Sequence, residues 1–321
     1  MNSKYRANFT ISFYRNSIGH DRLVELFNKL TLFKVYKYEI SEFKDNRIKK
    51  DQFYYYLENI NIISSNVRLT LLSSIKQNDF LNLYYYKTTN VFYIYGGIGD
   101  DDFDIWHSIE NTIFDFAVNN HIISSSIRLT SESMFNELKH PSQIQRLRPD
   151  IKEIKMKGNF ADPEQFPAHT HNIDGIWFGC CYEMWFGSDY DKYIPLEKLR
   201  SFDQCKLNET LENGTVHIVL YDSPDDFASE KSVANAWAFR KHTECDKEAD
   251  FWEAQVRELS KGLGQQVYEI EEGKFPHGGI RLIKTYLDEN GKHVPKHEAV
   301  KVHISERGHD GKAVFEKIDD L

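Results

Sequence analysis

The sequence predicts an α/β N-terminal half, residues 1–150, built from a duplicated β-α-β-α unit, and an α+β C-terminal half, residues 151–321, with antiparallel hairpins. Three observations predict this organisation. A ten-residue segment recurs almost unchanged in the first half, strand-like and helix-like patterns alternate around it, and Asn-Gly turn signals separate strand-like runs in the second half. Alternating strands and helices are typical of helices packed on a sheet.

The recurring segment is Asn61–Thr70, NIISSNVRLT, which returns as His121–Thr130, HIISSSIRLT. Seven of the ten residues are identical, and the two copies begin 60 positions apart. Such similarity at a fixed spacing indicates an internal repeat. We expect each copy to end a helix, turn at Ser-Ser and enter a strand, which would place Arg68 and Arg128 at equivalent positions.

Each repeat unit is expected to contain two strands and two helices. Apolar residues alternate with polar ones in the strand segments, whereas they recur every three or four positions in the helix segments. Gly96-Gly97 is expected to end the strand before it. The expected strands are 9–14, 33–38, 67–72, 91–95 and 127–130, and the expected helices are 23–30, 52–60, 80–86, 105–118 and 133–138.

The two halves are expected to divide near Pro149-Asp150, where the composition gains Gly, His, Glu and Trp. A linker or surface loop is expected at 155–170. The most apolar stretch of the chain, 176–187, predicts one buried strand or two short strands bent at Gly179. Asn213-Gly214 predicts a hairpin turn. Further helices are expected at 196–202, 233–241 and 251–263, and further strands at 267–270, 280–286 and 299–304.

The 321 residues are 40% hydrophobic and 28% charged, with a formal net charge of −9. Proteins that bind nucleic acid or anionic membranes need a basic face, so this acidic balance argues against both and permits a basic protein partner. No apolar run approaches the length of a membrane-spanning helix. The N-terminus lacks a signal-peptide core and the four cysteines lack a disulfide spacing, so we expect a cytoplasmic protein with reduced thiols.

The segment that comes closest to a metal motif is His169-Thr-His171. Two histidines two positions apart on a strand project from one face, and some zinc sites begin in this way. The spacing fits no standard zinc arrangement, so we expect exposed loop histidines and neither a metal nor a cofactor. Should a site form, the remaining candidate ligands are Cys180, Cys181, His217 and His242.

No other pattern identifies a reaction. The chain has no Gly-x-Ser-x-Gly elbow, and its adjacent cysteines lie in a Trp-Phe-Gly-Cys-Cys-Tyr run that is typical of a buried core. Gly96-Gly-Ile-Gly99 begins like a phosphate-binding loop, but it runs into four aspartates whose carboxylates would repel a phosphate. We therefore expect no catalytic residue.

Exposed carboxylates and aromatic residues favour a different function, the binding of a basic protein. Aromatic residues make up 14% of the chain, and tyrosine and tryptophan commonly anchor protein interfaces. Carboxylates around such anchors attract a cationic partner and accelerate its association. The residues expected at this interface are Asp189, Tyr190, Asp191, Asp222, Asp225 and Asp226.

A family resemblance lies between residues 175 and 245, roughly a fifth of the chain. Its motifs are Met184-Trp-Phe-Gly187, Tyr193-Ile-Pro195, Leu211-Glu-Asn-Gly214, Val216–Asp222 and Pro224-Asp-Asp226. This pattern resembles uncharacterised bacterial immunity-type proteins of polymorphic toxin systems, and its motifs are structural. The resemblance implies a cytosolic protein that binds and blocks a cognate toxin.

We therefore expect a non-enzymatic immunity or antitoxin protein that occludes a cognate basic toxin through an acidic, aromatic-rich surface. One alternative is a metal-dependent hydrolase that uses the His-x-His segment of the C-terminal half, and another is a scaffold or regulatory module whose duplicated half binds a small ligand. The metal content of the purified protein distinguishes the hydrolase from the other two.

Overall fold

A computed structural model arranges the chain as two compact units. Met1–Ile40 and Ile48–Glu253 form the larger unit, and Ser41–Arg47 and Ala254–Leu321 form the smaller one, so the units do not divide at residue 150. The structure describes residues 5–40, 47–58, 67–74, 78–100, 104–148, 151–158, 160–262, 268–272, 275–279, 281–291, 294, 296–308 and 313–321. The boundary expected at Pro149-Asp150 lies outside these residues.

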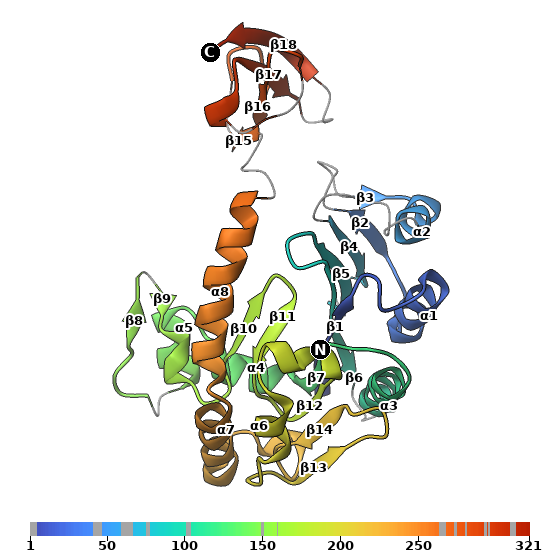
Figure 1. The fold of residues 1–321 in the computed structure, drawn as a ribbon, viewed down its shortest axis with the longest axis vertical. Coiled ribbons are helices and arrows are strands. Elements are labelled where there is room, and N and C mark those ends of the chain that lie inside the picture. The colour runs from blue at the N-terminus through green and yellow to red at the C-terminus, as the bar shows by residue number, and fades with distance from the viewer. Residues whose placement is uncertain are drawn as a thin grey trace. The chain divides into compact units, whose positions relative to one another are not determined.

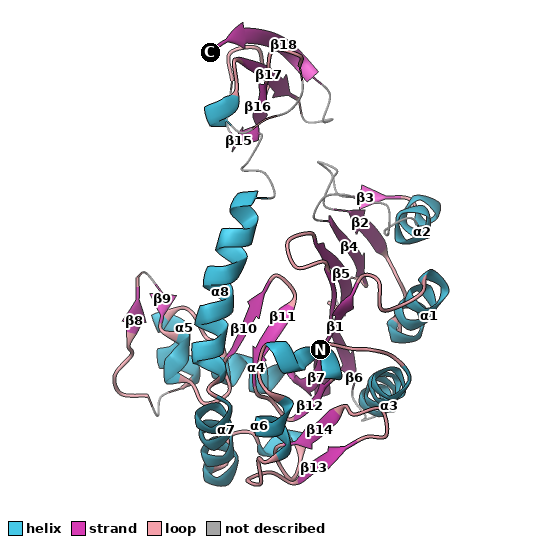
Figure 2. Ribbon diagram, in the orientation of Figure 1, coloured by secondary structure: helices cyan, strands magenta, loops and turns pink. Residues whose placement is uncertain are grey.

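Helices and strands occur in both units, as Figure 2 shows. The helices are α1 (His20–Leu30), α2 (Lys50–Glu58), α3 (Asp104–Asn119), α4 (Thr130–Asn136), α5 (Pro141–Leu147), α6 (Leu196–Arg200), α7 (Glu230–Thr243) and α8 (Cys245–Gly262), with short 3-10 helices η2 (Pro163–Gln165), η3 (Ser188–Lys192), η4 (Pro224–Asp226) and η5 (Lys296–Glu298). The strands are β1 (Tyr5–Tyr14), β2 (Lys37–Ile40), β3 (Arg47–Ile48), β4 (Val67–Leu72), β5 (Phe80–Tyr86), β6 (Val91–Asp100), β7 (Ser124–Leu129), β8 (Met156–Lys157), β9 (Phe160–Ala161), β10 (Thr170–Ile173), β11 (Ile176–Gly179), β12 (Glu183–Phe186), β13 (Leu207–Thr210), β14 (Val216–Val219), β15 (Tyr268–Glu272), β16 (Arg281–Leu287), β17 (Lys301–Arg307) and β18 (Ala313–Asp320).

A ten-stranded sheet organises the larger unit, in the strand order β13-β14-β12-β7-β1-β6-β5-β4-β2-β3. The pairings from β13 to β2 are antiparallel. Strand β7 pairs with β1 on one side and with β12 on the other, so that Ser126 lies opposite both Thr10 and Met184. Segments from both sides of residue 150 therefore belong to one hydrogen-bonded layer.

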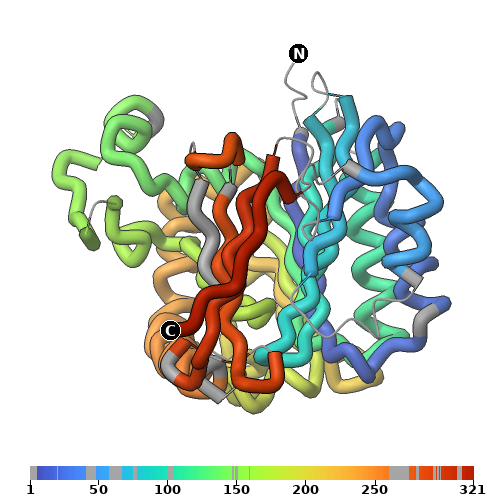
Figure 3. The backbone as a smooth tube through the Cα atoms, turned by 90° about the horizontal axis from the view of Figure 1, so that it is seen from above, coloured from blue at the N-terminus to red at the C-terminus, as the bar shows by residue number. Residues whose placement is uncertain are grey.

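Helices α1, α2 and α3 cover one face of the strands from β1 to β2 (Figure 1). Phe9, Ile11 and Phe13 alternate along β1 and are fully buried, because alternate residues of a strand project from the same face. Phe13 meets Phe116 of α3 with 5.7 Å between the ring centroids. In Figure 3 the blue helix α1 runs along the outer side of the blue and cyan strands.

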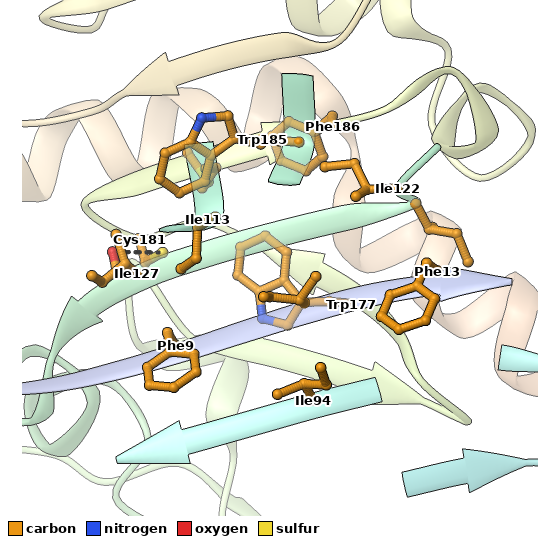
Figure 4. Packing of buried hydrophobic residues seen from close by; sticks show 14 of the residues in the cluster. Phe9, Phe13, Ile94, Ile113, Ile122, Ile127, Trp177, Cys181, Trp185 and Phe186 are labelled. Carbon is orange, nitrogen blue, oxygen red and sulfur yellow. Dashed lines mark hydrogen bonds between the residues drawn. The ribbon is translucent and has the colours of Figure 1, made fainter. Parts of the chain in front are cut away.

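Near β12 both faces of the sheet are covered, and all of Glu183–Phe186 is buried. On one face, Trp185 stacks on His217 with 5.0 Å between ring centroids. On the other, Phe186 packs against Tyr190 at 4.8 Å and against Phe239 of α7. Figure 4 shows this part of the core, where large apolar side chains of β1, β7, β11 and β12 gather.

Several expected elements are confirmed. The expected strand at 9–14 lies within β1, the helices at 52–60 and 105–118 correspond to α2 and α3, and the apolar stretch 176–187 forms the two short strands β11 and β12. The Asn-Gly turn joins β13 to β14 as an antiparallel hairpin, with Gly214 at a φ of +86°. Left-handed backbone of this kind favours glycine.

The repeated segment forms strands β4 and β7, but the elements around the two copies differ. The order β1-α1-β2-β3-α2-β4 is followed by β5-β6-α3-β7-α4, so a duplicated β-α-β-α unit is not confirmed. The turn expected at the second Ser-Ser pair is wrong, because Ser124 belongs to β7 and bonds through its hydroxyl to Ser12 of β1 at 2.9 Å. Residues 61–66 of the first copy lie outside the described residues.

Two further expectations about this half are wrong. Residues 80–86 form strand β5 instead of a helix, and β6 continues through Gly96-Gly97. A Cβ atom on Gly96 would lie 2.2 Å from the ring of Phe9, and one on Gly97 would lie 2.5 Å from the ring of Phe80. The two glycines therefore admit aromatic rings from the neighbouring strands and do not end the strand.

The smaller unit contains a four-stranded antiparallel sheet in the order β15-β16-β17-β18. Strands β16 and β17 correspond to expected strands, whereas β18 was not expected. Across the described residues of both units, every helix is too short or too polar to span a bilayer.

Candidate functional site

Strand β10 and the first turn of α8 bring three potential ligand side chains together. His169 directly precedes β10, His171 lies within it, and Asp246 is the second residue of α8. The Nε2 atoms of the two histidines are 3.0 Å apart. Asp246 Oδ1 lies 3.0 Å from Nε2 of His169 and 3.3 Å from Nε2 of His171. Three atoms that can each offer a lone pair thus converge, and we call these residues the His-His-Asp group.

Neighbouring groups orient these side chains. Nδ1 of His169 lies 3.0 Å from the carbonyl oxygen of Phe166, so Nδ1 is the donor and Nε2 faces Asp246. Arg240 of α7 donates to Asp246 Oδ2 from Nε at 3.1 Å and from Nη2 at 2.5 Å. Its Nη1 donates to the Phe166 carbonyl, and Nη2 also lies 3.2 Å from His169 Nε2.

The group lies at the edge of the core and is partly accessible. His169 and Arg240 are buried, whereas the side chains of His171 and Asp246 are 22% and 30% exposed. Burial alone would raise the pKa of Asp246, but His169, His171 and Arg240 outweigh it and hold that pKa well below its usual range. Asp246 therefore stays ionised, and solvent can reach it.

The residue that caps the C-terminus of α4, Glu137, anchors the His-x-His segment. Glu137 accepts a hydrogen bond from the hydroxyl of Thr170, the residue between the two histidines. It also accepts from Ser133 at 3.0 Å and from the guanidinium of Arg128 on β7 at 2.7 Å. The positions of His169 and His171 thus depend on a polar network that begins in the ten-stranded sheet.

The two adjacent cysteines do not join the His-His-Asp group. Both are fully buried, and each thiol lies 3.8 Å or less from backbone carbonyl oxygens. Burial raises the pKa of Cys180 and of Cys181 well above the usual range. Both therefore remain protonated, which makes them poor metal ligands and poor nucleophiles.

The other two candidate histidines also lie apart from the group. On β14, His217 lies 2.8 Å from Glu183 and 2.9 Å from Glu209. Burial opposes protonation there, but the two carboxylates outweigh it and raise the pKa of His217. On α7, the exposed His242 bonds through Nε2 to the carbonyl oxygen of Lys198 at 2.8 Å.

The candidate interface aspartates form two separate groups. Asp189 and Asp191 lie in η3, which follows β12, whereas Asp222 precedes η4 and Asp225 and Asp226 lie within it, after β14. Strands β12 and β14 are antiparallel neighbours, so these groups leave opposite ends of the sheet. Asp222 also pairs with Lys231 at 2.7 Å. These carboxylates therefore do not form one patch.

Tyr190, expected beside these aspartates at the interface, is instead a core residue. Its side chain is fully buried, and its hydroxyl donates to the carbonyl oxygen of Trp177 at 2.9 Å. Its ring packs among Phe178, Phe186 and Tyr193. The expectation that Tyr190 contacts a partner is therefore incorrect, because the 3-10 turn of η3 directs it inward.

A cluster of aromatic side chains lies on the face of β5 and β6 opposite α3. Tyr84 contacts Tyr86 and Tyr93, and Phe80 contacts Tyr95 with 5.1 Å between ring centroids. The guanidinium of Arg68 lies 5.9 Å from the ring centroid of Tyr84. Tyr93 is buried, and the other four rings are partly exposed. We call Phe80, Tyr84, Tyr86, Tyr93 and Tyr95 the aromatic face.

Comparisons with known proteins do not identify a function for the His-His-Asp group or for the aromatic face. No family model matches the chain, and no curated protein is similar to it. The chain is similar to a chain in a crystal structure of the toxic C-terminal tip of CdiA from Pseudomonas aeruginosa in complex with immune protein. The two are 10% identical, and the match covers 39% of this chain and 86% of that chain, with a TM-score of 0.26. A TM-score this low supports no argument about function.

Helix α4 carries a carboxyl group inside the protein, near Arg128. Glu132 is fully buried, and neither of its carboxyl oxygens has a hydrogen bond of standard geometry within the described residues. Burial raises the pKa of Glu132 to about 8, although the nearby Arg128 guanidinium opposes the shift. Glu132 is therefore predominantly protonated and neutral at pH 7.

Replacing Glu132 by glutamine is expected to stabilise the protein increasingly as the pH rises. Between the ordinary pKa of 4.5 and the folded value of about 8, the folded wild-type protein holds a proton that the unfolded chain releases, so wild-type stability falls with rising pH. The Glu132→Gln side chain has similar volume and does not titrate. Urea unfolding of both proteins from about pH 5 to about pH 9 measures the difference. Parallel pH profiles would mean that Glu132 is ionised when folded.

Proposed function

We propose that the chain is a non-enzymatic protein-binding module of immunity type, a cytosolic antitoxin that binds and occludes a basic cognate toxin. The observation that carries this proposal is the aromatic face of β5 and β6. The resemblance of residues 175–245 to immunity-type proteins gives independent support from the sequence.

The aromatic face has the chemistry of a binding surface. Tyrosine offers a large apolar ring and a polar hydroxyl, and it loses little conformational entropy on binding because it has two side-chain torsions. Helices α1–α3 pack on the opposite side of the same strands (Figure 1), so the rings stand on a rigid layer. A rigid, partly exposed group of tyrosines can anchor a partner without a large ordering cost.

In this proposal the acidic residues attract the partner at long range, and they do not form the contact itself. Because Asp191 and Asp225 lie at opposite ends of the sheet, they cannot flank one contact together. The formal net charge of −9 nevertheless produces a field that attracts a cationic partner over a longer range. Electrostatic attraction then accelerates association, while the aromatic face supplies the contact that slows dissociation.

The double variant Tyr84→Ala/Tyr95→Ala is expected to weaken binding of the toxin by roughly 30-fold or more, because anchoring aromatic residues each contribute about 1–2 kcal/mol or more. The full chain is first co-purified with its toxin from the source cells, and the toxin is then produced separately for calorimetric titration. The control is Tyr55→Ala on α2, whose side chain is 62% exposed and lies outside the aromatic face. This control is expected to bind as the wild type does.

Two results would count against the proposal. One is the absence of a stoichiometric protein partner, and the other is an unchanged dissociation constant in the double variant when circular dichroism shows it folded. Salt supplies a separate check, because the association rate constant should fall as ionic strength rises if the acidic charge attracts the partner.

A further inference from the structure

We propose that His169, His171 and Asp246 bind a divalent transition-metal ion, with zinc as the preferred ion. This inference does not depend on the proposed binding of a toxin. It rests on the geometry of three donor atoms and on the groups that orient them.

The separations between the donor atoms match a tetrahedral site. Zinc binds imidazole nitrogen and carboxylate oxygen at about 2.0–2.1 Å, and two corners of a tetrahedron of that radius are about 3.3 Å apart. The His169, His171 and Asp246 donor atoms are separated by 3.0, 3.0 and 3.3 Å. One ion can therefore contact all three donors after shifts of a few tenths of an ångström.

The hydrogen bonds around the group hold its three donor atoms close to one point. Because the His169 Nδ1 hydrogen faces the Phe166 carbonyl, Nε2 is the ring nitrogen left to face Asp246 Oδ1, at 3.0 Å. Arg240 Nη2 and His171 Nε2 lie 3.2 and 3.0 Å from the same nitrogen, so a bound ion would replace these contacts. A metal ion at this point would contact all three donor atoms at once.

The surrounding contacts are those that support metal ligands in proteins. A ligating histidine usually donates its second ring N–H to a carbonyl or carboxylate, as His169 does to Phe166. The second oxygen of a ligating carboxylate is usually hydrogen-bonded, as Asp246 Oδ2 is to Arg240. Thr170 is bonded to Glu137, which fixes the strand between the two histidines.

The bound ion would join two segments that are far apart in the sequence, the start of β10 and the start of α8. Within the part of the chain that the structure describes, no fourth His, Cys, Asp or Glu joins these three donors. The side chains of His171 and Asp246 are partly exposed, so a water molecule completes the coordination. Three protein ligands and one water are the arrangement of an accessible zinc site.

The experiment uses the full chain, purified without a histidine tag. We expect about one zinc ion per chain by elemental analysis, and cobalt(II) added to the metal-free protein should give the visible absorption of a tetrahedral site. His171→Ala should lose both signals, because it removes one of three protein ligands. His242→Ala is the matched control, since this exposed histidine bonds to Lys198 outside the group, and both signals should persist.

The proposal is overturned if the wild-type protein contains less than roughly 0.2 metal ions per chain and gives no cobalt spectrum. Unchanged metal content in His171→Ala would overturn it as well. Should His171→Ala fail to fold, Asp246→Asn keeps the size of the side chain and Arg240 can still donate to its amide oxygen. Loss of the cobalt spectrum in folded Asp246→Asn supports the metal site. Retention of the cobalt spectrum in this variant contradicts the metal site.

Discussion

Replacing Phe13 by alanine is expected to lower the free energy of unfolding of the larger unit by about 3–5 kcal/mol. The ring of Phe13 is fully buried between β1 and α3, with Phe92 and Phe116 at centroid distances of 5.8 and 5.7 Å. Its removal leaves a cavity at a place where the rigid sheet and helix cannot close in. Urea unfolding followed by tryptophan fluorescence measures the loss.

Phe251→Ala on α8 is the control for this measurement. The Phe251 side chain is 53% exposed, so its truncation removes the same ring without opening a buried cavity. It is expected to change stability by about 0.5 kcal/mol or less. If Phe13→Ala loses as little stability as Phe251→Ala, the Phe13 ring is not buried between β1 and α3 as the structure has it.

Replacing Arg128 by methionine is expected to cost about 3 kcal/mol, because it leaves the Glu137 carboxylate without its positive partner. Only 11% of the Arg128 side chain is exposed, and its guanidinium is 2.7 Å from Glu137. The apolar methionine retains much of the volume, so the loss reports mainly the unpaired charge. Because Glu137 also bonds to Thr170, we expect the His-x-His segment to become more mobile, which amide hydrogen exchange detects.

The double variant Arg128→Met/Glu137→Gln tests this explanation. With both charges removed, most of the lost stability should return, and the two substitutions should be strongly non-additive in a double-mutant cycle. If the double variant is no more stable than Arg128→Met, the loss comes from packing and not from the ion pair. The same result would remove Arg128 from the set of residues that position the His-His-Asp group.

Sequence patterns predicted elements well wherever apolar and polar residues alternate clearly. The alternation in β1 and the helical spacing in α3 each led to the correct element. Strand β5, Phe80–Tyr86, was mistaken for a helix because leucine and tyrosine make both of its faces look apolar. In the structure Leu81 and Leu83 are buried on the side of the helices, while Tyr84 is partly exposed on the other. The ambiguous pattern reflects tyrosine's ability to lie at a half-exposed position.

The candidate site could be predicted only in part. The spacing of His169 and His171 indicated two side chains on one face of a strand, and the structure brings them together. Asp246 and Arg240 were missed, because no local pattern connects residues that lie more than seventy positions away in the sequence. Only the packing of α7 and α8 beside β10 places them there. The aspartates between Asp222 and Asp226 were chosen on charge alone, and their side chains do not converge on one site with other candidate residues.

The position of β7 between β1 and β12 has a consequence for synthesis of the chain. When a ribosome has completed β7, the strand that will cover its free edge has not yet been made. Without residues 183–186, β7 would be an edge strand, and its unpaired backbone groups could pair with another chain. Strand β12 closes this edge, so a segment from the second half of the sequence protects a strand of the first half from such pairing.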